Sequence, residues 1–179
     1  MFLTAKRKTV LAASIACLLA SSAAFADEPG AGAQPEPPTL VHRVVDHATA
    51  SVASVQEMLG TALDLIGIRY RRGGTSPETG FDCSGFVNHV FREGLGLYLP
   101  HNAKQISQEG EAVSKKDLQP GDLVFFNTMR RAFSHVGIYL GDNKFVHAPR
   151  SGGAVRVEDM NESYWKKRFN GARRITAED

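Results

Sequence analysis

Cysteine is scarce in this chain, whose two cysteines are Cys17 and Cys83. Cys17 lies in an N-terminal segment that we expect to be removed, so Cys83 would remain as the single cysteine of the mature protein. One cysteine cannot form an internal disulfide, which excludes a fold held together by disulfide bonds. An unpaired cysteine is a hazard in an oxidising compartment, and this favours a chemical use for Cys83.

Several other patterns are missing from the sequence. It has no internal repeat, no glycine pattern for binding nucleotides, and no close-spaced ligand pair such as H-E-x-x-H or C-x-x-C. No cofactor is therefore expected, although a zinc protein with Cys83, His135 and His147 as ligands remains an alternative that metal analysis would decide. The length of 179 residues suits one domain with a genuine core and is too short for two ordinary ones.

The mature chain also lacks a surplus of basic residues. The full sequence has 21 Lys plus Arg and 19 Asp plus Glu, and the charges in residues 1–26 are Lys6, Arg7 and Lys8. Their removal leaves 18 basic against 19 acidic residues, a net charge of −1. A near-neutral protein without a long basic cluster is not expected to bind nucleic acid.

Residues 1–26 have the composition of a secretory signal peptide. Three basic residues precede an apolar run over residues 10–20, and Ala24-Phe25-Ala26 fits the small-residue cleavage pattern. Because the run is short for a membrane-spanning helix, we expect no stable membrane span and a mature protein in the periplasm or cell envelope. A retained anchor and lipoprotein processing at Cys17 are the alternatives.

The mature chain divides into a linker and one domain. Residues 27–40 are rich in Glu, Pro, Gly and Ala and lack the apolar residues that order a segment, and the ambiguous residues 41–50 are assigned to the same flexible linker, 27–50. Residues 51–67 carry apolar side chains at helical spacing, which predicts a helix that packs on a core. The folded domain is expected to span residues 51–179.

Cys83 lies where a second helix is expected to begin. Asp82 is a natural N-cap, and an apolar face follows at helical spacing, formed by Phe86, Val87, Val90 and Phe91. The unpaired N–H groups at a helix N-terminus stabilise a thiolate, which is the reactive form of cysteine. We therefore interpret Cys83 as a catalytic nucleophile; a small buried cysteine that fills a gap in the core is the alternative.

The second half of the domain predicts strands, two of which carry histidines. His135 and His147 lie in strand-like runs on either side of Gly141-Asp142-Asn143, a sequence typical of a hairpin turn. Such a hairpin can bring the two histidines together on neighbouring strands. Residues 123–126 predict a buried strand, residues 154–157 another strand, and residues 164–175 a closing helical turn with a last strand.

These motifs, in this order, resemble the NlpC/P60 family of cysteine peptidases, which are papain-like hydrolases of the bacterial cell wall. The resemblance covers Leu65 to Ile175 and includes Tyr70, Gly73-Gly74, the D-C-S-G-F motif around Cys83, Leu99-Pro100, residues 119–126 and both histidine motifs. It departs from the family at His101, where relatives commonly carry arginine. The resemblance implies an α+β, papain-like fold in which N-terminal helices pack on a mainly antiparallel sheet, with residues 51–179 as the catalytic domain.

The resemblance also implies a Cys-His-His triad and a set of substrate-binding groups. Cys83 would attack the peptide bond and form a thioester, His135 would act as acid and base, and His147 would orient His135. The groups that would bind the oxyanion or polar parts of the substrate are Tyr70, Asp82 and Ser84.

The substrate implied by the resemblance is peptidoglycan. The chain is similar to the small, single-domain murein endopeptidases of Gram-negative envelopes, and residues 27–65 leave no room for the SH3-like domain of many stem-cutting relatives. This predicts hydrolysis of the cross-link between D-alanine and meso-diaminopimelate. Cleavage of the stem peptide between D-γ-glutamate and diaminopimelate, and a non-catalytic cell-wall-binding module, are the alternatives.

Overall fold

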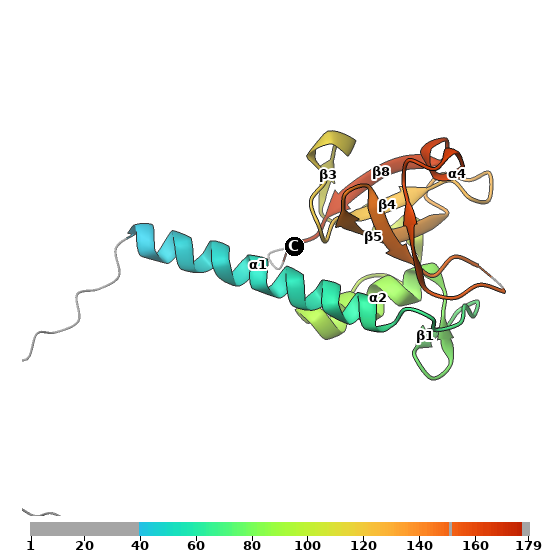
Figure 1. Ribbon diagram of the computed structural model, residues 1–179, viewed down its shortest axis with the longest axis horizontal. Coiled ribbons are helices and arrows are strands. Elements are labelled where there is room, and N and C mark those ends of the chain that lie inside the picture. Colours follow the sequence, from blue (N-terminus) through green and yellow to red (C-terminus); the bar gives the residue numbers. More distant parts are fainter. Residues whose placement is uncertain (1–39, 151, 177–179) are drawn as a thin grey trace, which may run out of the picture. The chain divides into compact units, whose positions relative to one another are not determined.

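The computed structural model describes residues 40–150 and 152–176 (Figure 1). The predicted signal peptide and the predicted linker up to residue 39 lie outside the described residues. Helices and a mainly antiparallel sheet make up the described part, so the predicted α+β class is confirmed. The elements are α1 (Leu40–Asp64), β1 (Thr75–Ser76), β2 (Gly80–Phe81), α2 (Cys83–Leu95), α3 (Ala103–Ile106), β3 (Glu111–Val113), the 3-10 helix η1 (Lys115–Asp117), β4 (Leu123–Phe126), β5 (His135–Gly141), β6 (Lys144–His147), β7 (Arg156–Asp159), α4 (Ser163–Lys166) and β8 (Phe169–Arg174).

Helix α1 starts at Leu40, earlier than the helix predicted from residue 51. No proline or glycine lies between Leu40 and Gly60, so nothing in the backbone chemistry of this segment interrupts a helix. Residues 41–50, which the sequence analysis assigned to the flexible linker, are therefore helical. Towards its C-terminal end the helix buries Met58 and Ala62 in the same core cluster as the apolar face of α2.

Helix α2 begins at Cys83, as the sequence predicted. The cap residue Asp82 is extended, and its Oδ1 accepts a 2.8 Å hydrogen bond from the backbone N–H of Gly85. The predicted apolar face is buried in the core, and its members are Phe86, Val87, Val90 and Phe91. Each buried side chain of this kind contributes about 1.5–3 kcal/mol, so packing holds the helix that carries Cys83 firmly in place.

The loop before α2 is bound to the first turn of that helix. The Oδ2 of Asp82 accepts a 2.9 Å hydrogen bond from the N–H of Gly73, and the N–H of Asp82 donates to the carbonyl oxygen of Gly74 at 3.0 Å. Glycine at position 85 permits this approach, because a Cβ atom there would collide with the same Gly74 carbonyl. These contacts fix the segment that follows Tyr70 relative to Cys83.

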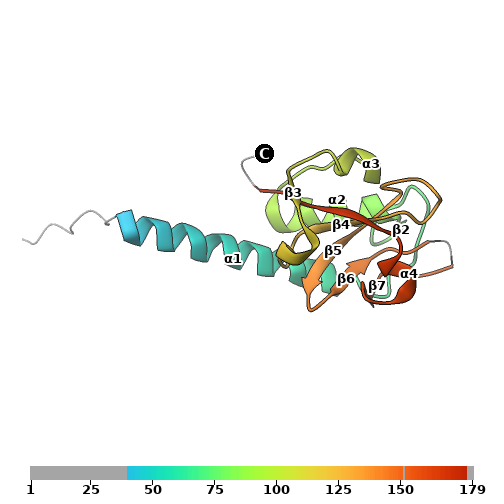
Figure 2. The same cartoon turned by 90° about the horizontal axis from the view of Figure 1, so that it is seen from above.

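Six strands form one antiparallel sheet in the order β3-β8-β4-β5-β6-β7, and Figure 2 shows β6 and β7 beside α4. Strands β5 and β6 form the predicted hairpin, and Asp142 and Asn143 adopt φ values of 48° and 59° at its turn. His135 is the first residue of β5 and His147 the last of β6. The hairpin therefore places both histidines at the same end of the sheet.

Both faces of the sheet are covered, which explains the run of four apolar residues in β4. Side chains alternate between the faces of a strand. Leu123 and Phe125 pack in one core cluster with α1 and α2, whereas Val124 and Phe126 pack in a second cluster with Trp165 of α4. Helices α2 and α4 thus lie on opposite sides of the sheet (Figure 1).

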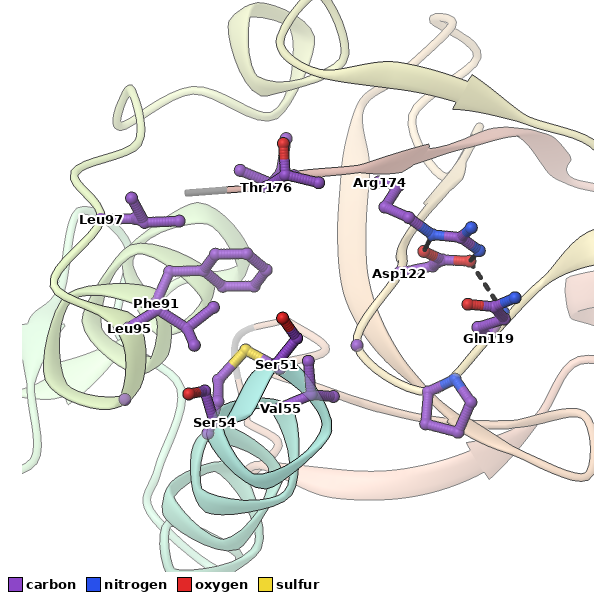
Figure 3. Close-up of a pocket in the computed structure, with 15 residues that line it drawn as sticks. Ser51, Ser54, Val55, Phe91, Leu95, Leu97, Gln119, Asp122, Arg174 and Thr176 are labelled. Atoms are coloured by element: carbon purple, nitrogen blue, oxygen red, sulfur yellow. Dashed lines mark hydrogen bonds and ion pairs between the residues drawn. The ribbon is translucent and has the colours of Figure 1, made fainter. Parts of the chain in front are cut away.

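Asp122, at the turn before β4, forms a nearly buried ion pair with Arg174 of β8 (Figure 3). Its side chain is 2% exposed, and its two oxygens accept 2.8 Å hydrogen bonds from Nε and Nη2 of Arg174. The backbone N–H of Gln119 also donates to Oδ2, at 2.8 Å. The pair borders a pocket of about 520 Å³ between α1, α2 and the end of β8. The ion pair ties the turn before β4 to β8, the last strand in the chain.

Replacing Asp122 with alanine is expected to lower the free energy of unfolding by about 2–3 kcal/mol. The change removes the acceptor of the Gln119 N–H and both carboxylate oxygens that bind Arg174. Arg174 keeps its hydrogen bond to the Asp117 carbonyl and is partly exposed, so the loss stays below that of a fully buried pair. Urea denaturation measures it. The control is Asp159→Asn, which breaks an exposed pair with Lys144 and should have a much smaller effect because solvent screens that pair. Equal losses in the two variants would contradict a structural role for the Asp122 pair.

Candidate active site

One pocket brings together residues from the helical and the sheet parts of the fold. It has a volume of about 520 Å³ and lies where the N-terminus of α2 meets β5, β7 and α4. Three of the six predicted site residues line it, namely Tyr70, Cys83 and His135. Residues far apart in the sequence thus line the same pocket as the cysteine that the sequence pattern singled out.

Cys83 is the half-buried first residue of α2. Burial, together with the negative charge of Asp82, raises the pKa of the Cys83 thiol to about 11. The backbone N–H groups of Val136, Ser84 and Cys83 itself act in the opposite direction but do not outweigh burial. The N–H groups at the start of α2 thus lower the pKa of Cys83 in the predicted direction, but desolvation outweighs them. At neutral pH the resting thiol is protonated.

His135 and His147 meet at the end of the β5–β6 hairpin. Nε2 of His135 lies 2.7 Å from Nδ1 of His147, which is the distance of a short hydrogen bond. The two residues are 3% and 0% exposed. Burial lowers the pKa of both imidazoles, and His147 lowers the pKa of His135 further. Both rings are neutral at neutral pH, and His147 contacts His135 without lining the described pocket.

Trp165 of α4 packs against both imidazoles. Its ring stacks on His135 at 5.7 Å between centroids with an interplanar angle of 27°, and it meets His147 nearly edge-on at 5.1 Å and 87°. Trp165 is itself buried. This packing restricts the rotation of both rings and so preserves the hydrogen bond between them.

Glu158 on β7 lies next to the histidine pair. Its Oε2 is 3.2 Å from Nε2 of His147, and its Oε1 accepts a 2.6 Å hydrogen bond from Nε of Arg156. Burial alone would raise the pKa of Glu158, but the hydrogen bonds with His147 and Arg156 outweigh it and lower the pKa to about 2. Glu158 is therefore ionised at neutral pH.

The sequence pattern did not single out Glu158 or Arg156. It predicted a strand over residues 154–157, and alternation within a strand places residues 156 and 158 on one face. The available signal was therefore a pair of opposite charges two residues apart. The pairing of β7 with β6, which sets Arg156 opposite His147, was not contained in any local pattern.

The other predicted binding residues occupy different surroundings. Tyr70 lines the pocket, and burial followed by the charge of Cys83 raises the pKa of its hydroxyl, which stays protonated and able to donate. Asp82 and Ser84 organise the first turn of α2, where Ser84 Oγ donates to Asp82 Oδ1 at 3.0 Å. His101 Nε2 lies 3.1 Å from the same Asp82 oxygen. Neither Asp82 nor Ser84 lines the described pocket.

Two alternatives left open by the sequence, a zinc protein and a retained membrane anchor, would each need a recognisable structural feature: a set of metal ligands or a membrane-spanning helix. Within residues 40–150 and 152–176, no three His, Cys, Asp or Glu side chains are grouped so that they could hold a metal ion. The zinc alternative therefore finds no ligand set in that part of the chain. No helix in the same residues is both long enough and apolar enough to cross a membrane.

The sequence that forms this fold and pocket matches a known protein family. Residues 67–174 match the sequence profile of the NlpC/P60 family, which is more than half of the chain. The chain belongs to the NlpC/P60 family. The resemblance read from the D-C-S-G-F and histidine motifs is thereby confirmed.

Two curated relatives of this NlpC/P60 chain differ in the activity that their names give. It is 50% identical over 112 residues to the "Murein DD-endopeptidase MepS/Murein LD-carboxypeptidase" of Escherichia coli (strain K12), which covers 63% of this chain and 58% of that protein. It is 45% identical over 131 residues to the "Gamma-DL-glutamyl hydrolase" of Bacillus subtilis (strain 168), covering 73% of this chain and 30% of that protein. The chain thus spans less than two thirds of either relative.

Solved structures of the NlpC/P60 family share the fold. A family protein from Bacillus cereus ATCC 10987 has a TM-score of 0.63 and 34% identity, covering 67% of this chain and 39% of that one. The NlpC/P60 domain of the peptidoglycan hydrolase SagA has a TM-score of 0.59 and 28% identity, covering 68% of this chain and 98% of that domain. The predicted arrangement of helices on a mainly antiparallel sheet is the one these structures share.

Proposed function

We propose that this NlpC/P60 domain is a cysteine peptidase that hydrolyses peptide bonds of peptidoglycan. The observation that carries the proposal is the pocket in which Cys83, at the start of α2, and His135, on β5, face the same space. The names of the relatives, a murein endopeptidase and a peptidoglycan hydrolase among them, support the substrate class. The triad is Cys83 as nucleophile, His135 as base and acid, and His147 as the group that orients His135.

The reaction follows from the protonation states of the resting pair. A neutral thiol beside a neutral imidazole forms little thiolate before substrate binds, so attack and proton transfer to His135 occur together. The sulfur forms a thioester with the carbonyl carbon, and the His135 imidazolium gives its proton to the leaving amine. His135 then takes a proton from water, which hydrolyses the thioester and releases the acid and the free thiol.

Two donors are proposed for the oxyanion that forms during attack. The backbone N–H of Cys83 belongs to the first turn of α2, whose N–H groups have no acceptor within the helix, and the Tyr70 hydroxyl stays protonated in the same pocket. Preorganised donors of this kind contribute about 3 kcal/mol each to stabilising the transition state. Asp82 and Ser84 would act on the substrate indirectly, by holding the first turn that presents these groups.

The bond that we propose is the cross-link between D-alanine and meso-diaminopimelate. Two relatives from Escherichia coli (strain K12) are named murein DD-endopeptidases, and they are 50% and 38% identical to this chain. The second candidate is the stem-peptide bond between D-γ-glutamate and diaminopimelate, which is favoured by the similarity to the Bacillus subtilis hydrolase over 131 residues. A non-catalytic cell-wall-binding module is a third reading, and binding to sacculi without turnover would support it.

The proposed location is the bacterial envelope, because the named relatives act on murein, a polymer of the cell wall. Residues 1–26 would serve as the signal peptide and direct the mature chain to the periplasm.

Incubation with purified cross-linked muropeptide dimers tests the bond. We expect intact tetrapeptide monomers, identified by mass, and a new free amine on diaminopimelate for each bond cut. Dipeptide stems truncated after glutamate would transfer the assignment to the D,L-endopeptidase reading. Dimers that stay intact while the protein binds sacculi would reject peptidase activity altogether.

A further inference from the structure

A chain of polar contacts continues from the candidate active site into β7. Nε2 of His135 contacts Nδ1 of His147 at 2.7 Å, and Nε2 of His147 lies 3.2 Å from Oε2 of Glu158. Both atoms of the second contact are buried, and neither makes a hydrogen bond of standard geometry with any described residue, so the 3.2 Å approach is the polar contact that each one has. An unsatisfied buried polar atom is costly, so the carboxylate and the imidazole depend on each other.

Arg156 fixes which oxygen of Glu158 faces the histidine. Its Nε and Nη2 both lie 2.6 Å from Oε1, which leaves Oε2 for His147. Strand β7 pairs with β6 so that Arg156 is opposite His147, and Glu158 lies two residues further on the same face. The register of two strands therefore aims a carboxylate at the far side of the histidine pair.

The position of this carboxylate determines the protons on both rings. A carboxylate accepts hydrogen bonds only, so the nitrogen that faces it, Nε2 of His147, must carry a proton. Nδ1 of neutral His147 is then an acceptor, and Nε2 of His135 must donate to it. The proton of neutral His135 is thereby fixed on Nε2, and Nδ1 is left as the nitrogen with a free lone pair.

We propose that Glu158 is a positioning residue that sets the tautomers of His147 and His135 and so keeps Nδ1 of His135 free to take the proton of Cys83. The proposal rests on the proposed function of Cys83 and His135 as nucleophile and base. Without the carboxylate, His147 can carry its proton on Nδ1 and donate to His135 instead. His135 would then hold its own proton on Nδ1, and it could not accept the proton of the thiol.

The charge of Glu158 has a second effect on the same pair. It raises the pKa of both imidazoles and so opposes burial, which lowers them. Arg156 opposes Glu158 by lowering the pKa of His147, and His147 lowers the pKa of His135. Among the described residues, the charged or titratable groups that act on the pair are thus Glu158, Arg156 and the histidines themselves, and Cys83, Arg150 and Glu162 line the same pocket. Removing the carboxylate makes His135 a weaker base.

The test compares Glu158→Gln with wild type and with Asp159→Asn. The glutamine side chain has nearly the same shape as glutamate without the charge, and Asp159 is the next carboxylate on β7, paired with Lys144 at 2.8 Å outside the pocket. Long-range ¹⁵N–¹H spectra of the histidine rings report which nitrogen is protonated. The rate of Cys83 alkylation by iodoacetamide, measured against pH, reports how well His135 accepts the thiol proton. Neither readout requires a substrate.

In wild type and Asp159→Asn we expect Nε2–H tautomers on both histidines. In Glu158→Gln we expect a mixture of tautomers, alkylation at pH 7 slower by about tenfold, and an acid limb that moves to lower pH because both imidazoles lose the charge that raised their pKa. If muropeptides are cleaved, kcat should fall by about ten- to a hundred-fold with little change in KM, the range seen when a partner that orients a functional histidine is lost. Glu158→Asp should recover part of the rate and the original acid limb.

Two outcomes would overturn the proposal. One is a Glu158→Gln variant with wild-type tautomers, acid limb and alkylation rate. The other is a slower variant whose tautomers and acid limb are unmoved, because that would indicate a role in packing alone. A wild-type protein that cleaves no muropeptide would instead reject the proposed function, and the spectra and alkylation rates would still decide the role of Glu158.

Discussion

Cys83→Ala is expected to abolish hydrolysis of muropeptides while the fold persists. The variant keeps the pocket, the histidine pair and Tyr70 but has no atom that can form the thioester, so we expect a rate at least about 10³-fold below wild type. Only a small, half-buried sulfur is lost, and the free energy of unfolding should change by less than about 1 kcal/mol. Product release followed by chromatography and a thermal melt measure the two quantities.

Cys83→Ser is the matched comparison, because it keeps the size and polarity of the side chain. We expect it to bind substrate and to lose most turnover, since a hydroxyl is a far weaker nucleophile beside a base with a lowered pKa. Normal hydrolysis by Cys83→Ala would contradict the proposed mechanism. A large loss of stability in that variant would support the alternative that the cysteine fills a gap in the core.

His135→Ala is expected to be nearly as damaging as the cysteine change, whereas His147→Asn should keep part of the activity. Among the described residues, His135 is the imidazole that lines the pocket with Cys83, while His147 is 0% exposed and does not line it. An asparagine oxygen at position 147 can still accept from Nε2 of His135. We expect losses of at least about 10³-fold and about ten- to a hundred-fold respectively, because members of a triad contribute unequally.

Initial rates at saturating and limiting substrate separate kcat from KM in both variants. His89→Ala serves as the control, since this histidine lies on α2 near Phe81 and does not line the pocket. Equal and complete loss in His135→Ala and His147→Asn would argue for a shared charge or a metal site in place of the base and its orienting group.

Much of the fold was readable because its signals are local. Asp82 as a cap and the apolar face through Phe91 predicted α2, and Asp142-Asn143 predicted the hairpin that joins the histidines. The apolar residues 123–126 predicted a strand buried on both faces. Each of these patterns depends only on residues close together in the chain, so it can be recognised in a single sequence.

The features that were missed depend on distant neighbours or on solvent exclusion. The start of α1 was placed at residue 51 because apolar periodicity defined it, although helix propensity continues back to Leu40. The net direction of the Cys83 pKa shift was not contained in the local pattern, because burial comes from the whole fold and outweighs the local N–H groups. Glu158 was overlooked because its partner, His147, is set by the pairing of β6 with β7. The contact between Glu158 and His147 therefore exists only through tertiary packing.

The raised pKa of Cys83 also bears on how an unpaired cysteine survives. With a pKa of about 11, about one free thiol in ten thousand is ionised at pH 7. Peroxides and foreign disulfides react with the thiolate, so oxidation to a sulfenic acid or to a mixed disulfide is slow for a sulfur held in this state. In the proposed mechanism the sulfur becomes reactive only when a substrate carbonyl is bound for attack and His135 accepts the proton of the thiol. The same burial that keeps the thiol protonated at rest would thus protect it from oxidation in the proposed periplasmic location.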